Sequence, residues 1–216
     1  MSAAMLPKAL PAASEDAEEI ARMQRLFERQ RLAFEAAPYP ERAARKAGLR
    51  RLIDALRRHQ DDIVAAVNGD FGVRSGVETR MVEVMGPMLE ARHALSHLGR
   101  WMKPRRRSTE LLFLGNRAWV SHQPKGVVGI IGTWNAPLFT LFAPLAYALA
   151  AGNRAILKPS EIVPRTARVV AEAVAGRMPA FVDTGLTSGQ QYIYYVEAEN
   201  AVGRGAWSTP DSATAP

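Results

Sequence analysis
The chain has 216 residues, of which 48% are hydrophobic and none is cysteine, and its formal net charge is +7. This length holds one good hydrophobic core or two small ones, and the lack of cysteine excludes disulfides and thiolate metal sites. No run reaches the ~18–20 apolar residues of a membrane span. The first residues also lack a signal-peptide pattern, so we expect a cytoplasmic protein without membrane contact.

The positive charge comes largely from arginines on predicted helical faces. It favours weak attraction to polyanions, dinucleotides included, but it does not indicate a specific nucleic-acid site. The arginine run 105–107 has no interleaved aromatic residues and no basic stripe beside it. We interpret that run as a solvated corner after a helix.

The N-terminal third predicts a layer of amphipathic helices. After an Ala/Pro-rich tail of about 14 residues, one helix begins near Glu15 and ends before Pro38. A second amphipathic run has its arginines outward, and it carries an inward apolar face made of Leu49, Leu52, Ile53, Leu56, Ile63, Val64 and Val67.

A third long helix is predicted to run to about Trp101. Ser75 and Glu78 have the spacing of a capping box at its start. Gly86-Pro87 interrupts the helical pattern, so we expect a bend there.

His93 and His97 stand four positions apart on this helix, which is the spacing of paired metal ligands. Glu90 is nearby, but no cysteine or further histidine joins them, and zinc sites normally need three or four protein ligands. We therefore predict no metal site and interpret both as surface or interface histidines.

Two strand-like runs follow, Leu111–Leu114 and Arg117–His122. Gly115-Asn116 joins them with a two-residue hairpin signal. A protruding apolar hairpin needs an edge partner or a cover.

The most informative stretch is 124–161. Residues 126–131 are apolar and β-branched, which is typical of a strand buried on both faces. A polar turn then leads into an apolar, buried helix over 138–150, with Pro137 in its first turn. Gly152-Asn153 closes that helix with residues that tolerate a left-handed conformation.

A second strand over 154–157 is followed by a polar loop, 158–161, and Pro164 begins another helix that reaches about Ala175. This β-α-β-α order predicts a parallel sheet with helices on its faces, a partial Rossmann-like unit. Ligands bind outside the carboxyl ends of such strands. The polar residues after each strand should therefore face one crevice.

The motifs GTWNAP and LKPSE, at this separation, resemble the aldehyde dehydrogenase superfamily. The flanks Phe71-Gly72 and 100–104 (RWMKP) resemble its class 3 branch, and coniferyl aldehyde dehydrogenases in particular. The resemblance covers roughly residues 1–178. Thr133 departs from it, since the family usually has proline before the tryptophan.

The resemblance implies an NAD(P)-dependent oxidation of an aldehyde, coniferyl or another aromatic or aliphatic one, to the acid. Asn135 matches the family's oxyanion-hole amide, and Trp134 matches a residue lining the site near the cofactor. Lys158 and Glu161 match residues that contact the adenosine ribose hydroxyls. The expected cofactor-binding set is Ile131, Thr133, Trp134, Lys158, Ser160 and Glu161.

Each of these residues also has a purely structural interpretation. Asn135 is a candidate helix N-cap beside Pro137, and Trp134 a packing residue. Lys158 and Glu161 would form an exposed ion pair of little energetic value. The choice between NAD and NADP stays open, because Glu161 repels a 2′-phosphate whereas Lys158 attracts it.

The family chemistry also needs a thiolate nucleophile and a general-base glutamate. The chain contains no cysteine, and the family's Gly-Ser-Thr turn and catalytic glutamate are not recognisable in it. We therefore expect no aldehyde turnover by this chain alone. The resemblance further implies an oligomer arm, and hence a homodimer through the 111–122 hairpin.

From about Met178 the sequence changes character. Residues 181–216 resemble the last two strands of a fibronectin type III domain, with Leu186, Gly189 and Tyr192 at tyrosine-corner positions and a strand over 193–200. We therefore expect a truncated NAD(P)-binding region, 1–180, and a partial, antiparallel β segment, 181–216. The alternative function is a non-catalytic interaction or fusion module with vestigial cofactor-binding elements.

Overall fold

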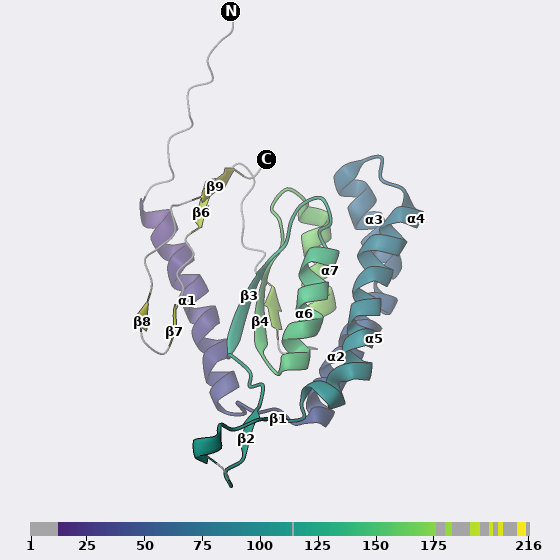
Figure 1. Ribbon diagram of the computed structural model, residues 1–216. Coiled ribbons are helices and arrows are strands. Elements are labelled where there is room, and N and C mark those ends of the chain that lie inside the picture. The colour runs from purple at the N-terminus through teal and green to yellow at the C-terminus, as the bar shows by residue number, and fades with distance from the viewer. Residues whose placement is uncertain are drawn as a thin grey trace, which may run out of the picture.

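The computed structural model describes residues 13–113, 115–175 and 180–182, and four short strands between residues 191 and 214. Helices lie on both faces of a small parallel sheet, which confirms the predicted α/β class (Figure 1). No helix in this described portion combines the length and the apolar character that crossing a membrane requires.

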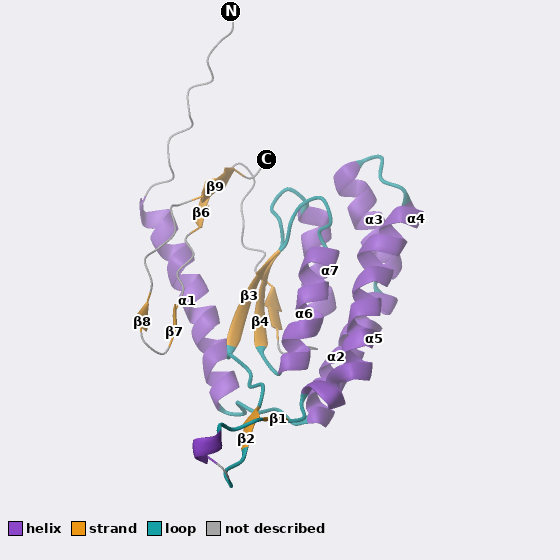
Figure 2. Ribbon diagram, in the orientation of Figure 1, coloured by secondary structure: helices purple, strands orange, loops and turns teal. Residues whose placement is uncertain are grey.

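The sheet has three parallel strands in the order β3 (Val127–Ile131), β4 (Arg154–Lys158) and β5 (Ala180–Val182). Helix α6 (Phe139–Ala151) connects β3 to β4, and α7 (Pro164–Val174) connects β4 to β5. Both helices lie on the same face of the sheet (Figure 2). The predicted βαβα unit is therefore confirmed.

The third strand lies partly beyond the expected boundary at residue 180. Phe181 pairs with Ile156 and Val182 with Leu157, so these two residues extend the parallel sheet. A three-residue apolar strand is too short to give a periodic signal. Its place is set by backbone pairing with β4 instead.

Helix α1 (Ala13–Glu35) contacts β3 and β4, and it lies on the face opposite α6 and α7 (Figure 1). An outer layer contains α2 (Arg42–Arg58), α3 (Gln60–Phe71) and α5 (Gly86–Trp101). Helices α2 and α5 pack on α6, and α3 packs on α7. The core is therefore sealed between this outer layer and the sheet, as the helical periodicity predicts.

One arginine departs from the predicted outward placement. Arg45 is buried, with Nη1 donating to the carbonyls of Ala150 (3.2 Å) and Ala151 (2.9 Å) and Nε to Pro40 (2.8 Å). It thereby satisfies carbonyls at the end of α6, which have no partner inside the helix. Gly152 follows with a φ of +87°, and a Cβ there would lie 2.8 Å from the Arg45 guanidinium carbon.

The interruption before α5 is a wide helical turn. The chain runs from α4 (Gly76–Thr79) through a π-helix, η1 (Arg80–Met85), directly into α5. Pro87 has no N–H for the carbonyl four residues earlier, and its ring would crowd that carbonyl. The π-helix is the wider turn with which the chain accommodates this proline, and its buried residues are Glu83 and Val84.

The predicted capping box does not form. Ser75 makes no side-chain capping bond; its carbonyl accepts the Thr79 hydroxyl at 3.1 Å. Glu78 lies instead 3.5 Å from the Arg74 guanidinium. The charge of Arg74 provides a stronger partner for the carboxylate than a single backbone N–H.

The hairpin exists, but its first strand differs from the prediction. β1 (Arg105–Arg107) pairs antiparallel with β2 (Ala118–Val120), and Leu111–Phe113 forms a 3₁₀ turn, η2, with Leu114 outside the described residues. The arginine run is thus a strand rather than a corner. Its three residues are all exposed, so no buried face produced a strand pattern.

Two short antiparallel pairs lie in the C-terminal segment. β6 (Gln191–Tyr194) pairs with β9 (Asp211–Thr214), and β7 (Glu199–Asn200) pairs with β8 (Gly203–Arg204). Two separate strands thus occupy the span predicted as one strand over 193–200. Leu186 and Gly189 lie outside the described residues.

The core placement predicts a large loss of stability on truncating Leu157. This β4 side chain is fully buried, so Leu157→Ala is expected to lower the free energy of unfolding by about 2–5 kcal/mol. Val77→Ala is the control, because Val77 is 69% exposed and its truncation should change stability by less than about 0.5 kcal/mol. Urea unfolding followed by circular dichroism compares the two. Equal losses would contradict the assignment of Leu157 to the core.

Candidate functional site
The two predicted polar clusters meet at one edge of the sheet. Ile131, the last residue of β3, lies opposite Lys158, the last residue of β4. The N–H of Gly132 donates to the Lys158 carbonyl at 2.9 Å, which extends the pairing beyond the strands. The polar residues that follow β3 and β4 therefore lie at the same edge of the sheet, as the parallel topology predicts.

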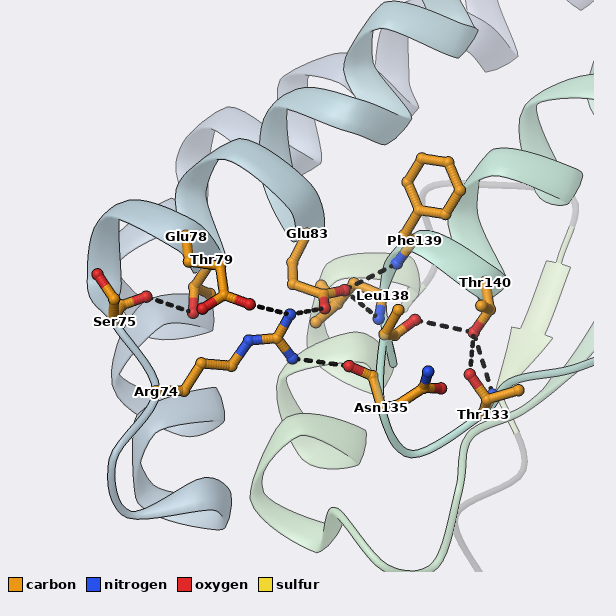
Figure 3. A network of polar contacts seen from close by, with 11 residues as sticks. Arg74, Ser75, Glu78, Thr79, Glu83, Thr133, Asn135, Leu138, Phe139 and Thr140 are labelled. Carbon is orange, nitrogen blue, oxygen red and sulfur yellow. Dashed lines mark hydrogen bonds and ion pairs between the residues drawn. The ribbon is translucent and has the colours of Figure 1, made fainter.

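The turn after β3 is hydrogen-bonded to the start of α6. Thr140 Oγ1 accepts the N–H of Thr133 at 3.0 Å and lies 3.4 Å from the Thr133 hydroxyl, while it donates to the Ala136 carbonyl at 2.9 Å (Figure 3). A Cβ on Gly132 would lie 2.6 Å from the Leu141 side chain. Glycine is therefore needed where this turn leaves the sheet.

Asn135 is exposed in this turn. Its backbone carbonyl is hydrogen-bonded, whereas its side chain is not bonded to any described residue. Its carbonyl accepts Arg74 Nη1 at 2.8 Å, and its amide makes no hydrogen bond to the described residues (Figure 3). The N-cap position of α6 is Leu138, without a side-chain capping bond. The alternative of Asn135 as a side-chain N-cap is therefore wrong.

A buried carboxylate takes the capping role instead. Glu83, on the π-helix, is fully buried, and its Oε2 accepts the N–H groups of Leu138 (2.9 Å) and Phe139 (3.0 Å). Its Oε1 lies 3.0 Å from Arg74 Nη2 in an ion pair. A negative charge at a helix N-terminus interacts favourably with the helix dipole. Glu83 and Arg74 together fix both sides of the Asn135 turn.

Burial raises the pKa of the Glu83 carboxyl group above its ordinary value. The two backbone N–H groups and the Arg74 guanidinium act in the opposite direction, but the desolvation of the carboxylate is the larger effect. Sequence reasoning missed this residue. The available signal was a glutamate four positions from both Thr79 and Pro87, on the inward face of the helix.

The segment 70–74 comprises the last two residues of α3 and the three that follow it, and we call it the brace. It contacts the turn after β3 and the start of α7. Asp70 accepts the N–H groups of Arg165 (3.2 Å) and Thr166 (2.8 Å) and the Thr166 hydroxyl (2.7 Å), so it caps α7. Phe71 stacks on Trp134 with ring centroids 6.3 Å apart. The Arg74 guanidinium lies 4.9 Å from the Phe71 ring centroid. One short segment therefore contacts both the turn after β3 and the start of α7, the helix that follows the second polar loop.

The second loop contains a buried ion pair. Lys158 Nζ contacts Glu161 Oε2, and the two side chains are only 10% and 8% exposed. The interpretation of this pair as an exposed one is therefore wrong. Ser160 Oγ accepts the N–H of Ile162 at 3.3 Å and shapes the loop.

The remaining predicted cofactor residues lie at the same edge and are exposed. The side chains of Ile131 and Trp134 are 61% and 52% exposed, and Thr133 is exposed beside them. The paired histidines lie elsewhere, on α5. The His93 and His97 rings stack with centroids 4.0 Å apart, and both contact the Trp101 ring.

The raised pKa of Glu83 predicts how stability changes with pH. A carboxyl group with a higher pKa in the folded state holds its proton more tightly there. The protonated Glu83 carboxyl group therefore contributes fully to the free energy of unfolding below the unfolded pKa of about 4.3. This contribution is lost as the pH rises through the pKa of the folded state. The stability of the wild type relative to Glu83→Gln should thus decline with rising pH.

Urea unfolding of both proteins between acidic and alkaline pH measures this difference. Glu78→Gln is the control, since Glu78 contacts the same arginine from an exposed position and should not produce the decline. A relative stability that rises with pH would mean that Arg74 and the two N–H groups outweigh desolvation.

Comparisons with known proteins agree with this geometry. The sequence profile of the aldehyde dehydrogenase family matches residues 8–191. A probable coniferyl aldehyde dehydrogenase of Pseudomonas aeruginosa is 41% identical over 162 residues, which are 75% of this chain and 34% of that protein. The chain therefore spans about a third of the length of this relative.

Solved structures of aldehyde dehydrogenases are also similar, and two of them serve as examples. The substrate-bound AldH of Staphylococcus aureus has a TM-score of 0.71 at 28% identity, over 74% of this chain and 36% of that one. The P. syringae indole-3-acetaldehyde dehydrogenase AldA, in complex with NAD+ and IAA, has a TM-score of 0.64 at 26% identity, over 76% and 34%. With a profile match over most of its length, this chain belongs to the aldehyde dehydrogenase family.

Proposed function
We propose that this chain supplies the cofactor edge and the oxyanion amide of an NAD(P)-dependent aldehyde dehydrogenase, which oxidises an aldehyde to the acid. The observation that carries the proposal is the pairing of Ile131 with Lys158, because it brings the Asn135 turn and the Lys158–Glu161 loop to one edge. The relatives named as coniferyl aldehyde dehydrogenases favour an aromatic aldehyde, coniferyl aldehyde included.

The residues at the end of β4 fit a nicotinamide dinucleotide. Lys158 offers an ammonium donor and Glu161 a carboxylate acceptor, and their buried contact holds them side by side. Such a pair suits the two adjacent hydroxyls of a ribose, and it lies where dinucleotides bind in α/β sheets. When bound, the dinucleotide accepts a hydride. Glu161 disfavours a 2′-phosphate and Lys158 favours one, while Ile131, Thr133, Trp134 and Ser160 complete the contact surface.

Asn135 is proposed to donate its side-chain N–H to the oxygen that becomes negative as the aldehyde is attacked. The bond from Arg74 to the Asn135 carbonyl fixes the backbone from which this side chain projects. The thiolate nucleophile of the family is not among these 216 residues, which include no cysteine. We therefore propose no aldehyde turnover by the chain alone.

Cofactor binding is tested by thermal unfolding with and without saturating NAD+, and then NADP+. A cooperative transition should shift upward, by about 2.7 kcal/mol of stability at a hundredfold excess over Kd. Lys158→Ala should reduce the shift, whereas Lys103→Ala, an exposed residue on another loop, should not. Glu161→Gln should weaken NAD+ more than NADP+. A cooperative unfolding transition whose midpoint temperature is unchanged by both dinucleotides would refute the proposal.

The hairpin is proposed as a dimer contact. Its tip carries exposed apolar side chains at Leu111, Leu112 and Phe113, and Trp119 on β2 is 64% exposed. Large apolar groups gathered on a protrusion favour burial against a partner. The partner is proposed to be a second copy of the chain.

Size-exclusion chromatography with light scattering tests this dimer over a range of concentrations. The wild type should approach twice the 23.6 kDa mass as concentration rises. The double variant Leu111→Ser with Leu112→Ser should remain at the monomer mass, because it loses the apolar contact. A wild type that stays monomeric at high concentration would count against the hairpin interface.

The C-terminal segment supports the alternative, an interaction or fusion module. The antiparallel pair β6–β9 favours a separate β segment within the expected span 181–216, similar to the end of a fibronectin type III domain. Phe181 and Val182 pair with β4 instead, and the family match continues to residue 191. Partner capture through this segment, unaffected by dinucleotide, would favour the alternative. The boundary near residue 180 and the cytoplasmic location stay predictions.

A further inference from the structure
A hollow of about 420 Å³ opens at the edge of the sheet opposite the cofactor edge. It lies where α5 and α6 end, beside β1 and the segment that leads into β3. This volume suits a small organic molecule. Its lining residues are Arg45, Leu98, Trp101, Met102, Arg105, His122, Gln123, Lys125, Tyr147, Ala150, Ala151 and Asn153.

The lining carries positive charge without negative charge. Arg45, Arg105 and Lys125 contribute three cations, and His122 adds an imidazole ring. Aspartate and glutamate are absent from the lining, all of which belongs to the described residues. An anion would therefore find several attractive charges and no repelling carboxylate on these walls.

The polar side chains that line the hollow have mainly hydrogen-bond donors available, because their acceptor atoms already form hydrogen bonds. Asn153 Oδ1 accepts the N–H groups of Lys125 (2.7 Å) and Gly126 (3.1 Å), so its acceptor is engaged and its NH₂ remains. Gln123 Oε1 likewise accepts the Tyr39 hydroxyl at 3.3 Å. Arg45 Nε and Nη1 donate to carbonyls, and Nη2 makes no hydrogen bond to the described residues. Converging donors match an anionic acceptor.

Aromatic and aliphatic groups form another part of the wall. The Trp101 and Tyr147 rings lie with centroids 6.1 Å apart at an angle of 38°. The Tyr147 hydroxyl donates to Glu90, so the ring rather than the hydroxyl is the group left for a ligand. Leu98 and Met102 extend this apolar wall. An aromatic ring packs well against such a surface.

We propose that this hollow binds a small aromatic carboxylate, with the ring against Trp101 and Tyr147 and the carboxylate toward Arg105, Lys125 and Asn153. The site does not depend on the proposed function. Strands β3 and β4 separate it from the cofactor edge, and each is five residues long, or roughly 16 Å.

The test titrates the full chain with benzoate, benzamide and benzylamine by isothermal calorimetry and by tryptophan fluorescence. The three probes share one ring and differ in charge. Benzoate is expected to saturate, with at least tenfold weaker binding of benzamide and none of benzylamine. Equal binding of benzoate and benzamide would overturn the assignment of an anion site.

Matched variants locate the ligand. Arg105→Gln should weaken benzoate binding at least tenfold, and Arg106→Gln should not, because Arg106 is on the same exposed strand but does not line the hollow. Trp101→Leu should remove the fluorescence response, and Trp119→Leu should preserve it. Loss of binding in the Arg106 and Trp119 variants alone would place benzoate outside the hollow.

Competition distinguishes this site from the cofactor edge. An excess of NAD+ should leave the benzoate affinity unchanged, since the two sites lie at opposite ends of the strands. Displacement of benzoate by NAD+, with a loss of binding in Lys158→Ala, would assign benzoate to the cofactor edge and overturn the proposal. A chain that binds benzoate but not NAD+ would refute the proposed function and leave this inference intact.

Discussion
The structure depends on the compensation of one buried negative charge. A fully buried carboxylate is costly unless charges and hydrogen-bond donors replace its water. Glu83 obtains them from the first N–H groups of α6 and from Arg74. Its partners belong to separate elements, so the π-helix, the brace and α6 are held in one arrangement. The Asn135 turn lies at the junction of these elements and takes its position from them.

The brace extends this constraint to the second half of the edge. Asp70 caps α7, Phe71 packs on Trp134, and Arg74 contacts both Glu83 and the Asn135 carbonyl. One segment of five residues thus contacts the turn after β3 and the helix that follows the loop after β4.

The two edges of the sheet differ chemically. The carboxyl edge presents an uncommitted amide at Asn135 and a Lys158–Glu161 pair that includes a carboxylate. The opposite edge presents cations and amide donors whose acceptors are already engaged, Asn153 among them. Parallel strands produce this separation, because residues before and after the strands collect at opposite ends. One small sheet can therefore carry two binding surfaces of different chemistry.

The sequence by itself determined the parallel unit, because apolar runs and the turn residues around Gly152 encode strands and helices locally. It also located Asn135 and Lys158 at strand ends, and hence at one edge. Only the tertiary structure decided which groups support them. Glu83 reaches Leu138 across 55 positions and Asp70 reaches Thr166 across 96. Local sequence patterns do not predict such distant contacts, since each contact depends on how separate helices pack. The arginine strand β1 was missed for the same reason: its partner, and not its own composition, makes it a strand.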